Sequence, residues 1–295
     1  MHTHRFVIYA SSICLALFMY LGSVPAAQAG IFYNVEVKGT YEDNVIGLLS
    51  DKRGGTAGVT TAPGAGMMSA MSMTGMGGQT PQYLGSSSQS NSDTSINLFA
   101  NLGSTTRIAD DTWIFFAGGV QHTSYSSFTQ FDSTIGSLST GINKGLGDIV
   151  TARLAINGAI KGYNDSQRNS SAYGANLLFK ERFAPSFWLK ESYDFEKNSA
   201  DSPFFTYQGN AASIWAGYLV APRATVLLGY NYLVRNFDQP SDFKVTAQTI
   251  SLGLEWELMK KWFLDAQYDH QVSDSNVPGT NTTDNIYSIG LRYSY

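Results

Sequence analysis

The chain ends with a nine-residue stretch, Tyr287-Ser288-Ile289-Gly290-Leu291-Arg292-Tyr293-Ser294-Tyr295. Apolar or aromatic residues alternate in it with small or polar ones. Successive side chains of a β-strand point to opposite faces, so a period of two indicates a strand with one apolar and one polar face. The stretch therefore predicts a strand with an apolar environment on one face and water on the other.

The same alternation recurs along the chain in runs bounded by turn residues. The runs lie near 31–41, 94–107, 112–124, 131–143, 148–162, 171–183, 186–197, 205–220, 224–235, 244–258, 262–272 and 287–295. The second, third and fourth runs are weaker, and the faces of the third are ambiguous over Trp113–Phe116. We expect about twelve strands, an even number as in bacterial membrane barrels.

The connections between these runs alternate strictly in length. Short ones lie near 109–111, 144–148, 184–186, 221–223 and 259–261, and longer ones near 42–92, 125–131, 163–170, 198–204, 236–243 and 273–283. This pattern predicts an all-β fold, a closed transmembrane antiparallel up-and-down β-barrel with short periplasmic turns and longer extracellular loops. The alternative is a soluble secreted β-sandwich, which does not require loops of alternating length.

The N-terminal segment has the layout of a secretory signal peptide. Arg5 precedes an apolar run over Phe6–Leu21, and the small-residue site Ala27-Gln28-Ala29 follows. We expect Sec-type export and cleavage near Ala29, which divides the chain into a signal peptide, 1–29, and a barrel, 30–295. An uncleaved N-terminal helix is the alternative. The single cysteine, Cys14, lies in this segment, so the mature chain has no thiolate metal site or disulfide.

The composition excludes some classes of function. Without Arg5 the mature chain has a formal charge of (19 − 1) − 23 = −5, which argues against a nucleic-acid partner. Charged residues make up 14% of the chain, below the usual value of about 25%. Beyond the signal, no apolar run approaches the roughly 18 residues of a membrane helix, so only a closed barrel could span a membrane.

The segment 42–92 is too long for an ordinary loop and is rich in Gly, Ser, Thr and Met. Five thioethers cluster within it and form a weak candidate for a Cu(I) site, because soft sulfur ligands select that ion: Met67, Met68, Met71, Met73 and Met76. The simpler interpretation is an apolar extracellular loop, since the segment contains no histidine. We therefore expect no cofactor and no bound metal.

Two histidines of the mature chain raise the question of catalysis. His122-Thr123-Ser124 resembles the His and Ser spacing of outer-membrane phospholipase A, but the Asn-Gly of that family does not follow the serine. Asp269-His270 resembles a pair in outer-membrane proteases, but adjacent strand residues point to opposite faces. The sequence favours a protein that is not an enzyme.

If the apolar stripes face lipid, the opposite stripes face the lumen, where charges are tolerated. The predicted pore-lining residues are Glu36, Lys38, Arg153, Lys161, Lys180, Lys190, Asp194, Glu196, Arg235, Glu255, Asp265, Asp269 and Arg292. Both signs occur in near-equal number. This mixture predicts either a weakly selective water-filled pore or ion pairs with a purely structural role.

Gly39-Thr40-Tyr41-Glu42-Asp43-Asn44-Val45, together with the signal peptide and the last strand, resembles outer-membrane β-barrel porin families of Gram-negative bacteria. The last strand resembles the assembly signal that the barrel-assembly machinery reads, although a final Tyr replaces the commoner Phe. The matching positions are Tyr287, Ile289, Leu291, Tyr293 and Tyr295.

This resemblance implies a location in the outer membrane, in contact with its lipid and lipopolysaccharide. The expected function is passive diffusion of small polar solutes, and a homo-oligomer is compatible with it. The alternative is a structural or interaction barrel with a closed lumen, serving envelope export, adhesion or surface-polymer association.

Overall fold

The computed structural model describes residues 29–45, 92–277 and 281–295. Residues 1–28 of the expected signal peptide and the methionine cluster lie outside these residues, as does most of the 42–92 segment, whereas Ala29 is the first residue of the first strand. No helix in the described ranges is long and apolar enough to cross a membrane.

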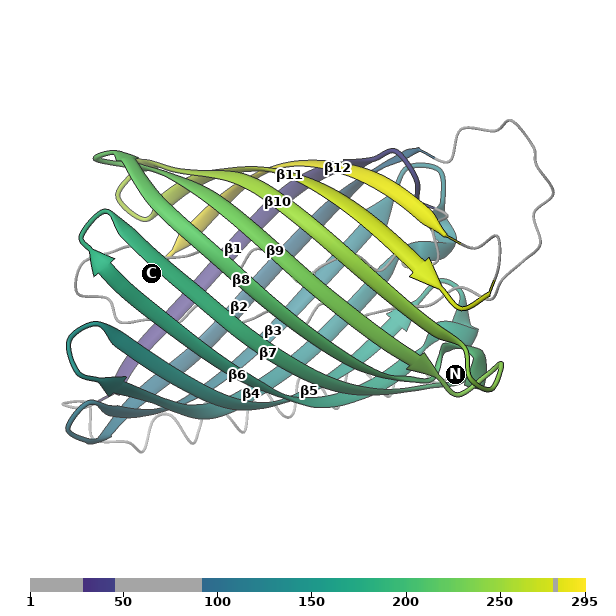
Figure 1. Ribbon diagram of the computed structural model, residues 1–295, viewed down its shortest axis with the longest axis horizontal. Coiled ribbons are helices and arrows are strands. Elements are labelled where there is room, and N and C mark those ends of the chain that lie inside the picture. Colours follow the sequence, from purple (N-terminus) through teal and green to yellow (C-terminus); the bar gives the residue numbers. More distant parts are fainter. Residues whose placement is uncertain (1–28, 46–91, 278–280) are drawn as a thin grey trace.

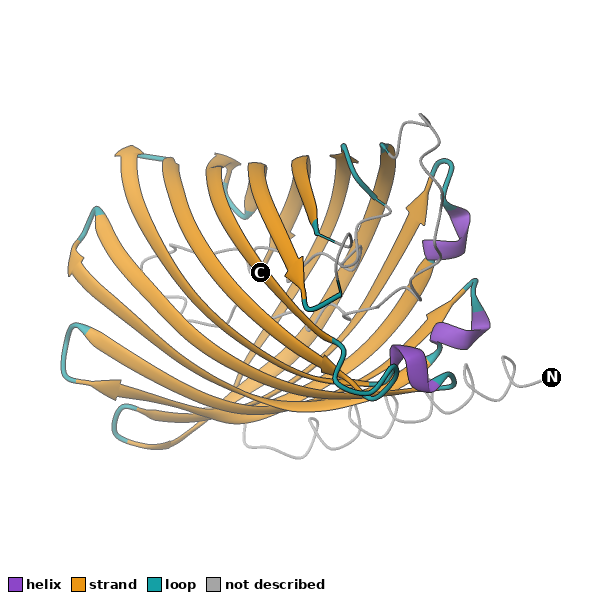
Figure 2. Cartoon of the chain, turned by 45° about the vertical axis from the view of Figure 1, so that its right-hand side comes forward, coloured by secondary structure: helices purple, strands orange, loops and turns teal. Residues whose placement is uncertain are grey.

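The described residues form a closed barrel in which every strand pairs antiparallel with its sequence neighbours and β12 pairs with β1 (Figures 1 and 2). The twelve strands of these residues are β1 (Ala29–Glu42), β2 (Asp93–Ala109), β3 (Thr112–Tyr125), β4 (Ser133–Leu146), β5 (Val150–Tyr163), β6 (Ser170–Ala184), β7 (Phe187–Ala200), β8 (Tyr207–Ala221), β9 (Ala224–Phe237), β10 (Lys244–Met259), β11 (Trp262–Ser275) and β12 (Thr282–Ser294). The predicted all-β closed barrel is confirmed, with the expected number of strands.

The two ends of the barrel differ, as the loop lengths predict. Turns of two or three residues connect β2 to β3, β4 to β5, β6 to β7, β8 to β9 and β10 to β11, and we call this the short-turn end. Asp111, Gly147 and Lys261 have positive φ there, which lets the chain reverse within so few residues. The opposite, long-loop end carries three short 3-10 helices, η1 (Thr129–Phe131), η2 (Ser166–Arg168) and η3 (Pro203–Phe205).

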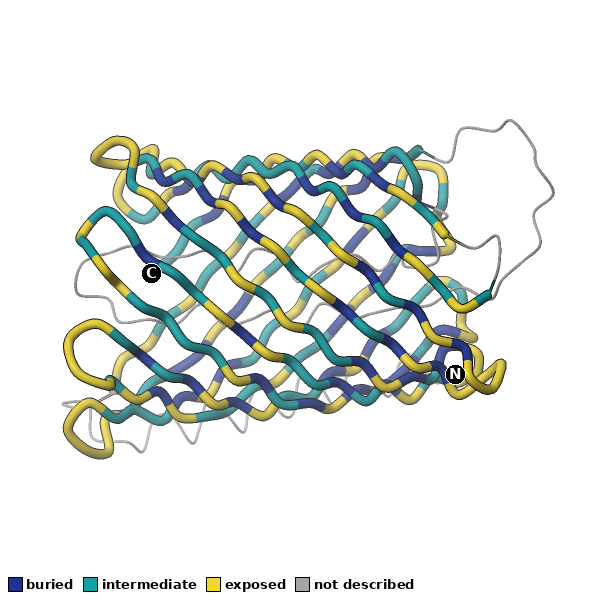
Figure 3. Tube along the Cα trace, viewed as in Figure 1, coloured by how far each residue is buried: buried dark blue, intermediate teal, exposed yellow. Residues whose placement is uncertain are grey.

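Burial alternates along the strands, which Figure 3 shows as a repeated change of colour. On β10, Ile250, Leu252 and Leu254 are exposed and face outward, whereas Ser251 and Glu255 are buried and face inward. The apolar stripes predicted for the strands therefore lie on the outer face of the barrel.

The ambiguous third run is settled by its strand. Phe115 on β3 is 1% exposed and faces inward, whereas Phe116 is 42% exposed and faces outward. Along each strand of a closed barrel, side chains alternate between the inner and the outer face. The faces of Phe115 and Phe116 therefore fix the faces of the residues next to them.

Candidate functional site

All thirteen charged residues predicted to line a pore occupy inward-facing positions of their strands. Eight are buried: Lys38, Arg153, Lys161, Glu196, Arg235, Glu255, Asp269 and Arg292. Five are half-buried: Glu36, Lys180, Lys190, Asp194 and Asp265. The structure thus places them on one continuous inner wall, while their part in conduction stays a prediction.

The two signs of charge gather on opposite sides of this wall. Of the thirteen residues, β5 to β7 carry four cations and two acids, a balance of 4 − 2 = +2. The strands β10, β11, β12 and β1 carry two cations and four acids, a balance of 2 − 4 = −2. Since β6 and β12 are six places apart in the ring of twelve, a basic wall faces an acidic wall.

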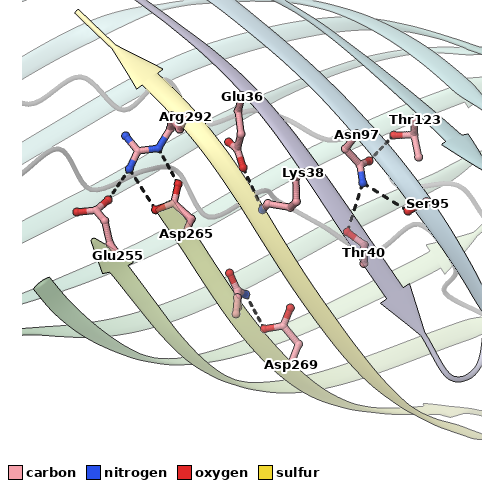
Figure 4. A network of polar contacts seen from close by, with 11 residues as sticks. Glu36, Lys38, Thr40, Ser95, Asn97, Thr123, Glu255, Asp265, Asp269 and Arg292 are labelled. Atoms are coloured by element: carbon pink, nitrogen blue, oxygen red, sulfur yellow. Dashed lines mark hydrogen bonds and ion pairs between the residues drawn. The ribbon is translucent and has the colours of Figure 1, made fainter. Parts of the chain in front are cut away.

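The acidic wall is organised around one guanidinium group (Figure 4). Arg292 on β12 contacts Glu255 on β10 at 2.5 Å and Asp265 on β11 at 3.0 Å. Its guanidinium carbon also lies 4.5 Å from the centre of the Phe263 ring. Asp265 thus has its charged partner on the neighbouring strand, whereas the contact between Arg292 and Glu255 passes across β11 to the second strand along.

A second network crosses the inner wall nearer the long-loop end. Lys161 on β5 contacts Glu196 on β7 at 3.0 Å, and the Tyr207 hydroxyl donates to the same carboxylate oxygen at 2.6 Å. The Arg235 guanidinium, on a residue only 1% exposed, lies 5.0 Å from the centre of the Tyr207 ring. Some of the predicted pore charges thus form the structural ion pairs that the sequence left as an alternative.

The basic wall is different, because two of its lysines contact rings. Lys180 on β6 and Lys190 on β7 are directly opposite each other in the strand register. Their ammonium nitrogens lie 5.1 Å from the centre of the Trp188 ring and 5.8 Å from that of Trp215, respectively. Among the described residues, neither lysine has a carboxylate within ion-pair distance.

Sequence reasoning missed the two tryptophans and a loop arginine. Trp188 and Trp215 occupy positions of the inner stripe, so the alternation around them could have identified them. Arg168 in η2 is buried, with its guanidinium carbon within 4.9–5.4 Å of the ring centres of Phe131, Tyr163 and Phe205. No periodic pattern marks it, because it lies in a loop.

The residues considered for catalysis are not brought together into a triad in the described part of the chain. His122 and Ser124 lie on the exposed outer face of β3, where the His122 ring nitrogen contacts the Thr134 hydroxyl at 3.0 Å. Asp269 faces inward and His270 outward, as the alternation predicts. Nor do three or more His, Cys, Asp or Glu side chains of the described residues gather as metal ligands.

The residues of the predicted assembly signal lie on the outward stripe of β12 and its end. At the short-turn end the Tyr33 ring lies 5.8 Å from that of Tyr293 and 5.2 Å from that of Tyr295. Lys261 places its ammonium 3.2 Å from the centre of the Tyr295 ring. This tyrosine group joins the first and last strands, and its recognition by assembly machinery stays a prediction.

No family model matches the chain, and no curated protein matches it. Among solved structures, it is similar to an outer membrane channel from Pseudomonas putida F1, with 9% identity and a TM-score of 0.57 over 92% of this chain and 99% of that one. The NanC porin matches with 10% identity and a TM-score of 0.49 over 88% and 98% of the two chains. The outer membrane channel DcaP of Acinetobacter baumannii matches with 10% identity and a TM-score of 0.45 over 92% and 99%. At such identities the likeness concerns architecture, and the first of these matches shows that the chain has the barrel fold of an outer membrane channel.

Proposed function

We propose that this protein is an outer-membrane channel that allows small polar solutes to diffuse passively. The observation that carries the proposal is the inner wall, where charged side chains of opposite sign gather on opposite sides of a closed barrel. Such an arrangement favours water and polar solutes over lipid inside the barrel.

The outer face supports a membrane location. Ile156, Leu228, Ile250, Leu252 and Ile289 are each more than half exposed and lie on outward stripes. A continuous apolar surface of this kind would be costly in water, whereas lipid covers it without penalty. The expected signal peptide would bring the chain to the outer membrane by export.

A structural barrel with a closed lumen is the second candidate, and one observation favours it. The loops at the long-loop end pack together through Arg168, Phe131 and Phe205, and all three residues are buried. Loops joined in this way would narrow the mouth of the barrel and present a firm surface to a partner.

Planar bilayer recordings on the full-length purified protein distinguish the two candidates. A channel gives discrete current steps whose size grows with the salt concentration. The control is that the protein inserts and is folded, judged by its β-rich circular dichroism. If such a protein gives no current steps at any salt concentration, the channel is rejected and the structural barrel is favoured.

A further inference from the structure

We propose that Lys180, Lys190 and Trp215 form a binding site for small organic anions, in which the two ammonium groups hold a carboxylate and the indole holds an apolar or aromatic body. The proposal deepens the channel function, because it assigns a solute class to one part of the inner wall. The site itself needs only access to the lumen, so equilibrium binding tests it separately from conduction.

Neither ammonium group of the site has a carboxylate at ion-pair distance among the described residues. Like charges directly opposite each other on neighbouring strands are unfavourable, and Lys180 and Lys190 are such a pair. In contrast, Lys38 and Lys161 on the same inner wall each contact a carboxylate. An anion between the two lysines would remove this repulsion.

The nearest inward-facing acid of β7 already accepts two hydrogen bonds. The Asp194 carboxylate accepts a hydrogen bond from the Asn176 amide at 2.8 Å and another from the Ser192 hydroxyl at 3.2 Å. Both lysines occupy inward-facing positions and are half-buried, so part of each residue remains exposed on the inner wall.

The apolar part of the site packs on glycines of the neighbouring strands. Trp188 on β7 lies over Gly217 on β8, where an added Cβ would be 2.1 Å from the ring. Trp215 on β8 lies over Gly229 on β9, where an added Cβ would be 2.7 Å from the ring. Both indoles therefore cover a glycine of the neighbouring strand.

Trp188 and Leu227 are buried and pack against Trp215, which is half-buried and presents its surface to the lumen. In the strand register, Lys180, Lys190, Trp215 and Gly229 occupy one row across four neighbouring strands. The charged and apolar halves of the site are thus adjacent in the fold before a ligand arrives, so binding requires no rearrangement of the strands.

These features select a ligand by its chemistry. A carboxylate can accept charge-assisted hydrogen bonds from both ammonium groups. A planar apolar body joined to it can pack against Trp215. A small inorganic anion lacks the apolar body that packs against Trp215, and an aromatic cation is repelled by the two ammonium groups.

Calorimetric titration of the full-length protein in detergent tests the site, with benzoate as probe and acetate and benzamide as probes that lack the ring or the charge. We expect saturable benzoate binding that is stronger than that of either control. Lys180→Gln and Lys190→Gln should each weaken benzoate about tenfold, because each removes one charge-assisted hydrogen bond. Trp215→Leu should weaken benzoate and leave acetate unchanged.

Lys144→Gln is the matched control, because Lys144 is exposed near the short-turn end and faces outward. It should bind benzoate as the native protein does, and Lys190→Arg, which keeps the charge, should retain binding. The proposal is overturned if benzoate binding to the native protein is undetectable. It is also overturned if the Lys180→Gln/Lys190→Gln double variant has native circular dichroism and binds benzoate as strongly as the native protein does. Binding without current steps would reject the channel and keep the site, whereas steps without binding would reject the site and keep the channel.

Discussion

Glu191 is the residue whose placement is least expected, because it interrupts the apolar outward stripe of β7. It is exposed, lies directly opposite Phe179 and Ile214 in the register, and has no ion pair or hydrogen bond with the described residues. In the proposed membrane orientation an acid among such neighbours faces lipid. Glu191→Leu should therefore raise the free energy of unfolding by roughly 1–2 kcal/mol, measured by urea titration in lipid vesicles.

Glu181 offers a control for this change. It also lies on the outward stripe, three residues before the end of β6 at the short-turn end. Since the cost of a charge falls toward the membrane interface and Glu181 lies two register positions nearer the short-turn end, Glu181→Leu should change the stability less. Equal effects of the two substitutions, or a loss of stability in Glu191→Leu, would argue against a lipid-facing Glu191 and for a protein partner that covers it.

Arg292 illustrates the opposite situation, an inner charge with two partners. Arg292→Met should cost about 3–5 kcal/mol of unfolding free energy, because the buried Glu255 and the half-buried Asp265 would both lose the cation that pairs with them. Adding Glu255→Gln and Asp265→Asn to that variant should recover much of the loss, as the same urea titration would reveal. No recovery in the triple variant would mean that the arginine stabilises the barrel through its packing on Phe263 instead.

At the scale of the strands, pairs of an aromatic residue and a glycine recur on the inner wall. Phe32 lies over Gly103, Trp188 over Gly217 and Trp215 over Gly229, each time directly across neighbouring strands. An aromatic ring over a glycine covers backbone that the glycine leaves bare and fixes the register of the two strands. The glycines of this wall are therefore part of its packing.

Gly217→Ala tests this role of the glycines. The new Cβ would overlap the Trp188 ring, so we expect a loss of about 2 kcal/mol in unfolding free energy together with a shifted Trp emission spectrum. Gly136→Ala is the matched control on β4, because no atom lies within 4 Å of its added Cβ. If both variants are equally stable, the contact between Trp188 and Gly217 does not hold the register.

The strands and their faces could be predicted because lipid and water act on every second residue, and the pattern in 244–258 or 287–295 records that directly. The contacts between side chains of the inner wall could not be predicted from the sequence. Whether Arg292 meets Glu255 depends on the stagger between β10 and β12, and alternation within a single strand carries no information about stagger. Arg168 was missed for another reason, since its aromatic partners come from β5 and from two separate loop helices.

At the scale of the whole molecule, the barrel combines two patterns that run around its circumference. The outward stripes are alike on nearly all strands, which suits a uniform lipid environment. The inward stripes differ, since β5 to β7 are net basic and β10 to β1 are net acidic. A field directed across the lumen follows from this arrangement, and its strength depends on charges on both walls.

Two single-charge substitutions on opposite walls should therefore shift ion selectivity in opposite directions. Lys190→Gln removes a cation from the basic wall and should increase the preference for cations. Asp269→Asn removes a buried acid that accepts a hydrogen bond from Gln267 at 2.6 Å, and should decrease that preference. Reversal potentials across a tenfold salt gradient measure both shifts, with outward-facing Lys144→Gln as the unchanged reference. Shifts of the same sign in both variants, or none in either, would contradict a path that runs between the two walls, because neutralising one charge on each side must act oppositely on a permeating ion.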